Sequence, residues 1–400
     1  MSILPEATSG AAPLISVVMA NFEAGDKIVH ALHSVLQQSV SDLEVIVSDD
    51  GSGDDSLAHV RRLMEVDGRI RLITTDQNGG PARCRNRALD AARGRWIAVV
   101  DSDDIIHPER FERLLAAAAA HDADIVADDL LLFFEDGSAP RLMLGEGAQR
   151  SFLVSTERWV LAGTDGSPAL GYLKPLISAE RLKAARYDEA LRIGEDFDLI
   201  LRLLLEGARL LVVPEPFYLY RRHSGSISHR LSVADMEAMV ARQKALLGAY
   251  GPLDGRIAAA FAQRLSGLEQ GLAYERLVAA VKARRLASVL ALMARNPGHV
   301  WRLWSSFAEG RQRRATPAQA ALPSPVLVLG AGAGEMVPAY VPISLMDWSA
   351  PAQRDVWRGL AARRGTGAVR CIPLDAAGRY AAGFIPEAIV AEPEIVREAS

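Results

Sequence analysis

The sequence predicts an α/β fold with a mostly parallel sheet flanked by helices, and three observations in its first hundred residues support this class. Apolar runs of strand length alternate with stretches of helical periodicity. The helical stretches are long enough for the right-handed crossovers that connect parallel strands. Acidic residues directly follow two of the apolar runs, at the carboxyl ends of strands, where ligands of such sheets bind.

Each expected element follows from its own pattern. Apolar runs predict strands at residues 14–20, 43–47, 69–74 and 95–100, and helical spacing predicts helices at 26–38, 54–66 and 81–93. Residues 236–250 and 254–294 are rich in Ala and Leu and predict about four helices. Prolines between residues 316 and 325 indicate a linker. We therefore expect a first α/β domain at 13–230, a helical region at 235–315 and a small α/β appendage at 325–400.

Composition narrows the class of protein. The 400 residues are enough for two or three domains, and 45 basic against 49 acidic residues give a net charge of −4, so nucleic acid is not an expected partner. Cys84 and Cys371 lack metal-site spacing and favour a reducing compartment. Residues 1–13 do not resemble a signal peptide, and no apolar run approaches the roughly 20 residues that span a bilayer. We expect a cytoplasmic protein.

The first acidic motif, Asp49-Asp50-Gly51-Ser52, ends the second predicted strand. Glycine permits a sharp turn, and the carboxylates can accept hydrogen bonds from a ribose hydroxyl or a base N–H. The alternative is an ordinary turn in which Ser52 or Asp54 caps the next helix.

The second acidic motif, Asp101-Ser102-Asp103-Asp104, follows the fourth predicted strand. Its three carboxylates would repel one another unless a cation or a hydrogen-bonded ligand held them. Hard cations are commonly bound by one or two carboxylates together with substrate phosphates. The alternative is a surface turn that caps a helix starting at Pro108.

Basic residues accompany these motifs. Arg83 and Arg87 share one face of the third predicted helix, and we expect that face to be solvated, whereas Arg85 points elsewhere and could reach the acidic strand ends. Lys174, before Pro175, is either a cation on the acceptor side of the site or a solvated loop residue.

Two later features have both a structural and a functional interpretation. Glu195-Asp196 suits the first turn of an amphipathic helix, and a helix that begins in a cleft would also position a carboxylate well. His223 lies in a loop rich in Ser and Gly, where a packed or surface histidine is the alternative to a functional one.

Taken together, these blocks resemble the family-2 glycosyltransferases, which are inverting enzymes of the GT-A fold. The resemblance covers about residues 13–230. It rests on the following segments, which occur in the order and at the spacings of that family: Ile15–Met19, Ser34–Ser39, Asp49–Ser52, Asn78 with Gly80, Arg85-Asn86, Asp101–Asp104, Lys174-Pro175, Gly194–Leu199 and Tyr220–Ser228.

The resemblance implies roles for the residues that would bind a nucleotide-sugar donor. Asp50 would hold the nucleotide base and Asp49 would support its turn, with Arg85 close by. Asp101 and Asp103 match the motif that binds the ribose and a divalent cation, Mn²⁺ or Mg²⁺, which bridges the donor diphosphate.

The resemblance also implies the residues of the chemical step. Asp196 corresponds to the catalytic base and Glu195 is its neighbour, while Arg221 and His223 match an element that closes over the diphosphate. One departure is visible, because Phe22-Glu23 replaces the Tyr-Asn that often follows the first strand.

The function expected from the resemblance is metal-dependent, inverting sugar transfer. The donor would be UDP-linked, and the acceptor would be a saccharide or lipid-linked saccharide in cell-envelope or exopolysaccharide biosynthesis. A sugar nucleotidyltransferase is an alternative, but it needs a cationic Gly-rich loop after the first strand, and residues 20–25 carry no cation. An inactive nucleotide-sugar-binding scaffold is a second alternative, and the presence of Asp196 argues against it.

The region after the expected catalytic domain has two interpretations. Residues 282–314 contain eight Lys or Arg and one acid, Glu309, around Trp301, Trp304 and Phe307. This pattern fits peripheral association with the inner face of the plasma membrane, or a helix that packs its aromatics on the catalytic domain. Gly330–Gly334 resembles a phosphate-binding turn, but Pro338 disfavours the helix that should follow it.

Overall fold

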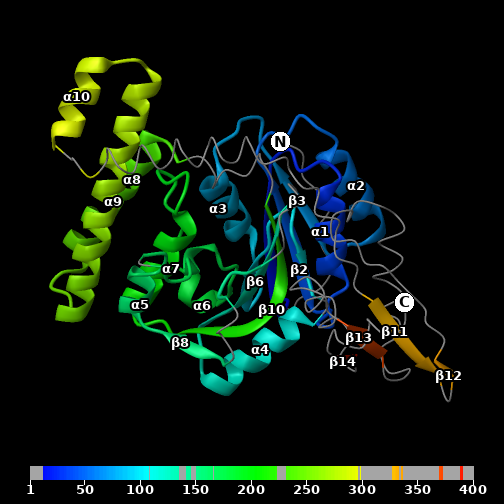
Figure 1. Ribbon diagram of the computed structural model, residues 1–400. Helices are drawn as coiled ribbons and strands as arrows, with labels where there is room; N and C mark the ends of the chain where they lie inside the picture. The colour runs from blue at the N-terminus through cyan, green and yellow to red at the C-terminus, as the bar shows by residue number, and fades with distance from the viewer. Residues whose placement is uncertain are drawn as a thin grey trace.

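Figure 1 shows the computed structural model of the chain. The structure describes residues 12–107, 109–134, 141–145, 150–164, 166–222, 231–295 and 298, together with the backbone of four short strands after residue 326. Within these residues a ten-stranded mixed sheet has the order β3-β2-β1-β4-β9-β6-β10-β5, with β7 paired to β6 and β8 paired to β10. The structure thus confirms the expected α/β class.

The first half of the sheet is parallel, as the sequence predicted. Its strands are β1 (Ile15–Asn21), β2 (Leu43–Asp49), β3 (Ile70–Thr74) and β4 (Trp96–Val99), and β1 pairs with both β2 and β4. They are connected by α1 (Lys27–Leu36), α2 (Ser56–Val66) and α3 (Pro81–Ala91). Figure 1 shows α3 on one face of the sheet and α1 and α2 on the other. All seven residues of β2 are buried, which explains why the strands appear as nearly unbroken apolar runs.

The second half of the sheet is mixed. Strand β6 (Ile125–Phe134) runs parallel to β10 (Leu210–Arg222), and the short β9 (Leu176–Ser178) is antiparallel to both β4 and β6. The remaining short strands are β5 (Ile105–Ile106), β7 (Arg141–Leu142) and β8 (Phe152–Val154). The helices of this half are α4 (Arg110–His121), α5 (Thr156–Val160), α6 (Ala179–Leu182) and α7 (Glu195–Leu205), with a 3₁₀ turn at Leu170–Tyr172.

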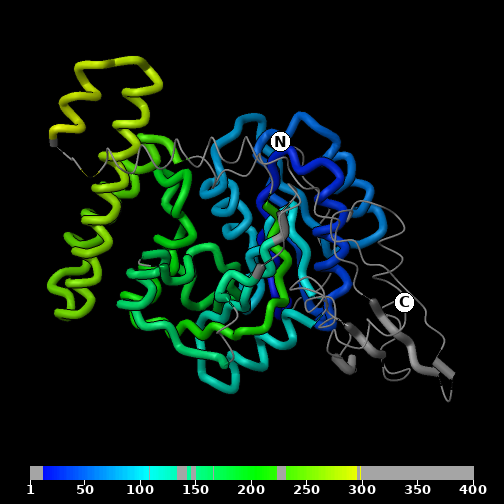
Figure 2. Tube along the Cα trace, viewed as in Figure 1, coloured from blue at the N-terminus to red at the C-terminus, as the bar shows by residue number. Residues whose placement is uncertain are grey.

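Three helices follow the sheet over residues 231–295, where the sequence predicted about four. They are α8 (Val233–Tyr250), α9 (Gly255–Lys282) and α10 (Leu286–Arg295), and Figure 2 traces them along one side of the molecule. Ion pairs hold α8 to the preceding core: Arg192 contacts Asp235 at 3.0 Å, and Arg242 contacts Asp198 of α7 at 2.6 Å. Residues 233–282 therefore pack against the sheet-containing part of the chain. Trp301, Trp304 and Phe307 lie outside the described residues.

The four C-terminal strands form a separate small sheet in the order β12-β11-β13-β14. They are β11 (Leu327–Gly332), β12 (Glu335–Met336), β13 (Val369–Ile372) and β14 (Ala388–Val390). A short antiparallel strand, and not a helix, follows β11, so the backbone here differs from a dinucleotide-binding turn. In the described part of the chain, no helix combines the length and the apolar character needed to cross a membrane.

Candidate active site

The carboxyl ends of β1, β2 and β4 and the start of α7 line one cleft, which has a volume of about 480 Å³. Seven of the residues predicted for the site line it: Asp50, Arg85, Asp101, Asp103, Glu195, Asp196 and Arg221. Asp49 is fully buried at the end of β2, next to Asp50. His223 lies outside the described residues, so its role stays a prediction.

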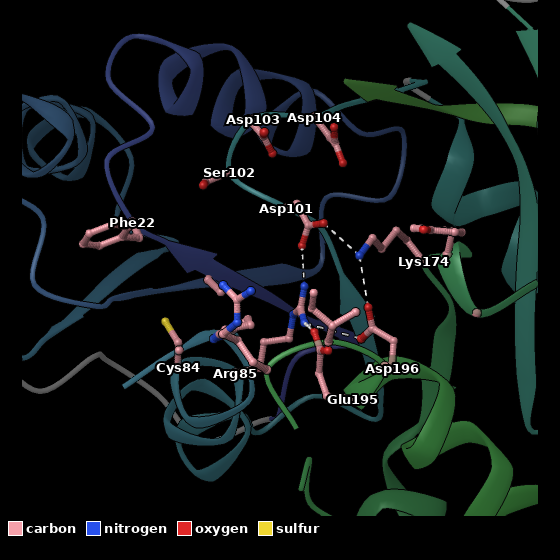
Figure 3. Close-up of a pocket in the computed structure, with 18 of the residues that line it drawn as sticks. Phe22, Cys84, Arg85, Asp101, Ser102, Asp103, Asp104, Lys174, Glu195 and Asp196 are labelled. Atoms are coloured by element: carbon pink, nitrogen blue, oxygen red, sulfur yellow. Dashed lines mark hydrogen bonds and ion pairs between the residues drawn. The ribbon is translucent and has the colours of Figure 1, made fainter. Parts of the chain in front are cut away.

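Two buried cations join three acids at the centre of the cleft (Figure 3). Arg85 Nη2 lies 2.9 Å from Asp101 Oδ1, and Arg85 Nη1 lies 2.7 Å from Glu195 Oε1 and 3.5 Å from Asp196 Oδ1. Lys174 Nζ lies 2.8 Å from Asp101 Oδ2 and 3.2 Å from Asp196 Oδ2. We call these five residues the central ion cluster. It connects the loop after β4 to the first turn of α7.

The two cations remain charged although they are buried. Burial lowers the pKa of Arg85, but the charges of Asp196, Asp101 and Glu195 outweigh it and raise that pKa well above its ordinary value. The pKa of Lys174 is also raised, because Asp101 and Asp196 outweigh its burial.

Within the cluster, the pKa values of Asp101 and Glu195 shift in opposite directions. Burial acts to raise the pKa of Asp101, but Lys174 and Arg85 hold it below its ordinary value. Burial and the charge of Asp196 raise the pKa of Glu195, and Arg85 only partly offsets them. Asp101 is therefore the firmly ionised anchor of the two cations.

Local structure explains how Asp196 and Lys174 reach the cleft. Gly194 precedes α7 with φ +88°, a conformation that favours glycine, and α7 then begins with Glu195 and Asp196 facing the cleft. The pair thus forms the first turn of a helix that begins in the cleft, as expected, and its catalytic role stays a prediction. The carbonyl of Lys174 accepts a hydrogen bond from Arg110, whose Nη2 also lies 2.7 Å from Asp128 Oδ1 in a fully buried ion pair.

The first acidic motif closes its own turn. Asp49 accepts hydrogen bonds from Asn21 Nδ2 at 2.7 Å, from Ser52 Oγ at 2.6 Å, and from the backbone N–H groups of Gly51 and Ser52. Neither Ser52 nor Asp54 is the N-cap of α2, because that residue is Asp55.

Hydrogen bonds to Asp50 connect the end of β2 to the loop after β3. Its Oδ2 accepts from the backbone N–H groups of Gly79 and Gly80 at 2.8 and 2.7 Å, and its Oδ1 accepts from Arg87 Nη2 at 2.8 Å. The prediction that Arg87 is solvated was wrong, because its ion pair with the buried carboxylate of Asp50 keeps the arginine partly buried. Arg83 is exposed, as expected.

The three carboxylates of the second acidic motif lie in different surroundings. Asp101 contacts the central cations, while Asp104 is buried and accepts from Tyr218 Oη at 2.8 Å and from the backbone N–H of Arg221 at 2.7 Å. Burial, with the charges of Asp103 and Asp101, raises the pKa of Asp104. Asp103 lines the cleft, and its carbonyl accepts from Arg221 Nε at 2.9 Å. The motif does not cap α4, whose N-cap residue is Glu109.

The carboxylates offer hard oxygen ligands suited to Mg²⁺ or Mn²⁺. Among the residues that the structure describes, no three His, Cys, Asp or Glu side chains converge in a complete metal site. Both oxygens of Asp101 contact protein cations, whereas Asp103 lines the cleft. This arrangement fits a cation that takes one or two carboxylates and draws its other ligands from substrate phosphates.

The loop after β1 departs from the family pattern but still reaches the cleft. Phe22 is 47% exposed and lines the cleft, and the backbone N–H of Glu23 donates to Ser52 Oγ at 2.9 Å. Glu23 adopts φ +50°, which asparagine tolerates more readily than glutamate. The departure therefore places an aromatic ring and a carboxylate in this loop, and both residues line the cleft.

Three further residues shape the site. Of these, only Lys174 was considered from the sequence, and it is buried in the cleft, so the alternative of a solvated loop residue was wrong. Lys174 had a weak signal, its position before Pro175, but its two ion pairs could not be foreseen. Tyr218 and Arg264 carried no signal, because β10 and α9 bring them in from distant parts of the chain. Tyr218 is fully buried and its hydroxyl hydrogen-bonds Asp101 and Asp104, whereas Arg264 lines the cleft.

Comparisons with known proteins agree with this fold. Residues 16–171 match the family model Glycosyl transferase family 2. The chain is 37% identical over 291 residues to succinoglycan biosynthesis protein ExoO of Rhizobium meliloti (strain 1021), covering 71% of this chain and 82% of that relative. It is 30% identical over 253 residues to ExoU of the same organism, covering 60% and 71%.

The solved structures confirm the GT-A fold. S. aureus TarS 1-349 in complex with UDP-GlcNAc superposes with a TM-score of 0.51 at 17% identity and covers 71% of this chain and 92% of TarS 1-349. The complex of TarS 1-349 with UDP gives 0.50 at 22% identity, covering 64% and 70%. Fold and sequence relatives together define a glycosyltransferase. The chain belongs to glycosyl transferase family 2.

Arg85→Gln tests the central ion cluster. Because removal of one partner leaves buried charges uncompensated, we expect a loss of about 3–5 kcal/mol in the free energy of unfolding. Arg85 opposes the rise in the pKa of Glu195, so the loss should be larger at pH 8, where more of Glu195 is ionised and needs a cation, than at pH 5, where more of it is protonated. Urea unfolding at both pH values measures it.

Arg83→Gln is the control for this measurement, because it removes an exposed arginine from the same helix. Equal stability of the two variants at both pH values would contradict the cluster.

Proposed function

We propose that this glycosyltransferase uses a divalent metal and inverts the anomeric centre. In this proposal it transfers a sugar from a UDP-linked donor to a saccharide or lipid-linked saccharide during cell-envelope or exopolysaccharide biosynthesis. The observation that carries the proposal is the central ion cluster, which sets Asp101 and Asp196 on one cleft at the carboxyl edge of the sheet. The names of ExoO and ExoU support the pathway, and the TarS complexes with UDP and UDP-GlcNAc support the donor.

The donor would lie between the two acidic motifs. Asp50 lines the cleft beside Gly80 and would contribute to recognition of the nucleotide base, while Asp49 keeps its turn closed. Arg221 lines the cleft next to the second motif, and its cationic side chain would face the diphosphate; His223 has the same proposed role. Negative charge grows on the departing diphosphate, so cations placed there stabilise the transition state more than the ground state.

A divalent cation fits next to Asp103. When bound, Mg²⁺ or Mn²⁺ would neutralise charge on the departing diphosphate. Asp103 would supply a carboxylate oxygen, and Asp101 would supply another if it exchanged one of its contacts with Lys174 or Arg85. The N–H of Arg221 fixes Asp104, and Arg221 Nε fixes the carbonyl of Asp103, so this loop is held in place independently of a ligand.

Asp196 is the proposed general base. The acceptor hydroxyl must lose its proton as it attacks the anomeric carbon from the face opposite the leaving group, and this geometry inverts the centre. Lys174 Nζ and Arg85 Nη1 contact the two oxygens of Asp196 and so fix its orientation. Glu195, with its raised pKa and its closer contact to Arg85, is better suited to holding that arginine.

Family membership leaves the sugar nucleotidyltransferase alternative without support. The inactive scaffold remains a distinct outcome, which turnover measurements separate from an enzyme.

A location at the inner face of the plasma membrane stays part of the proposal. Leu286 and Leu290, four residues apart on α10, are 76% and 68% exposed, and Arg284 and Arg285 precede them. Exposed apolar side chains suit insertion into the surface of a bilayer, and the basic side chains beside them suit its negative charge. The cytoplasmic location itself is a prediction from the sequence.

Asp196→Asn tests the base. We expect turnover of the UDP-sugar to fall roughly 100-fold to 10,000-fold, because the amide cannot accept the proton, while UDP binding changes little. Release of UDP from a panel of UDP-sugars, with saccharide acceptors and Mn²⁺, measures turnover, and thermal stabilisation by UDP measures binding.

The matched control is Asp122→Asn, a change at a side chain that is 95% exposed and outside the cleft. Full activity in Asp196→Asn would contradict the assigned base, and UDP binding without turnover in the wild type would support the scaffold instead.

Asp103→Ala tests the metal. A ligand that binds only the folded state raises the melting temperature, so UDP with Mn²⁺ should stabilise the wild type more than UDP alone. The variant should lose the part of the stabilisation that depends on Mn²⁺. Asp42→Ala, at an exposed position before β2 and therefore at the opposite edge of the sheet, should keep it. An unchanged metal response in Asp103→Ala would rule out Asp103 as a ligand.

A further inference from the structure

Arg264 of α9 lines the cleft although it lies outside the segment that matches the family model. Its Nη1 donates to the carbonyls of Val160 and Ala162 at 3.2 and 3.4 Å. Its guanidinium lies 3.7 Å from the centre of the Phe197 ring, on the residue next to Asp196. The helical region thus places a cation against the ring of the residue that follows the proposed base in the sequence.

This cation has no acidic partner in the part of the chain that the structure describes. Three other cations of the cleft have one: Arg85 and Lys174 pair with the central acids, and Arg192 pairs with Asp235. Arg264 Nε is buried and has no hydrogen-bond partner among the described residues. Both hydrogen bonds that the guanidinium donates to those residues come from Nη1. Burial lowers the pKa of Arg264 to about 10, so the group still carries its charge at neutral pH.

Arg264 lies in the half of the cleft away from the nucleotide. Figure 1 shows α9 beside α5 and α7, at the opposite side of the fold from β2 and β3, which carry Asp50 and the Asn78–Gly80 loop. Ala162, Ala169 and Gly171 also line the cleft, and none of them has a side chain larger than a methyl group, which leaves room for a ligand. A saccharide in this half would present its hydroxyl to Asp196.

We infer that Arg264 binds an anionic group of the acceptor, a carboxylate or a phosphate, and so selects a negatively charged saccharide. The inference rests on the proposed function, because it takes Asp196 as the base that separates the donor half from the acceptor half. A planar guanidinium with unused N–H donors matches two oxygens of either anion. The two long hydrogen bonds to carbonyls and the cation–π contact with Phe197 give Arg264 no countercharge within the described residues, and a bound anion would supply one.

Ligand-observed NMR titration of the full chain, with UDP and Mn²⁺ present, tests the inference. The probes are methyl β-D-glucoside, methyl β-D-glucuronide and glucose 6-phosphate. We expect the wild type to bind an anionic probe about tenfold to hundredfold more tightly than the neutral one, which is the range of a charge-assisted hydrogen bond. Preference for the glucuronide indicates a carboxylate, and preference for the phosphate ester indicates a phosphate.

Three variants locate this preference. Arg264→Gln should abolish it, and Arg264→Lys should keep part of it, because the charge remains without the planar donors. Arg256→Gln removes an exposed arginine from the same helix and should leave it unchanged. Thermal stabilisation by UDP in each sample reports whether the donor half stays intact.

Two outcomes would overturn the inference. One is a wild type that binds UDP but treats charged and neutral saccharides alike. The other is an Arg264→Gln variant that loses UDP binding, which would place the residue on the donor side. A wild type that fails to bind UDP would instead contradict the proposed function, so the two failures can be told apart.

Discussion

The structure of the site depends on the ion pairs that Arg85 and Lys174 make with three acids. Asp101 comes from the loop after β4, whereas Glu195 and Asp196 begin α7, far along the chain. In a buried cleft such carboxylates would repel one another and their charged forms would be destabilised. Two buried cations remove this conflict and join the donor half of the cleft to the half that holds the proposed base. The arrangement that we propose for sugar transfer and the stability of the cleft therefore depend on the same ion pairs.

Elements outside the cleft keep this cluster in place. Arg110, which forms a buried ion pair with Asp128, also donates a hydrogen bond to the carbonyl of Lys174. This contact helps to fix the backbone from which the amino group of Lys174 extends into the cluster. The helical region acts from the other side, because Arg242 of α8 contacts Asp198 of α7 and Arg264 of α9 lies against Phe197. Helices beyond the segment matched by the family model thus form part of the cleft wall.

The order of strands and helices in the first half, and the gathering of acids at the strand ends, could be predicted because buried parallel strands leave strong apolar runs. The three-residue β9 leaves no such run, and its antiparallel pairing with β4 and β6 could not be predicted. Individual side chains were harder still. Arg87 was expected in solvent but contacts Asp50, and Arg264 had no signal, because both contacts exist only after distant elements pack. His223 lies outside the described residues and is still known only from its motif.

A crystal structure of the full chain with an intact UDP-sugar and Mn²⁺ tests the central claim most directly. The account predicts one donor molecule bound between Asp50 and Asp103, with its anomeric carbon facing Asp196, and Lys174 still within ion-pair distance of that carboxylate. A nucleotide bound on another surface, or an Asp196 carboxylate turned out of the cleft once the donor is in place, would contradict it.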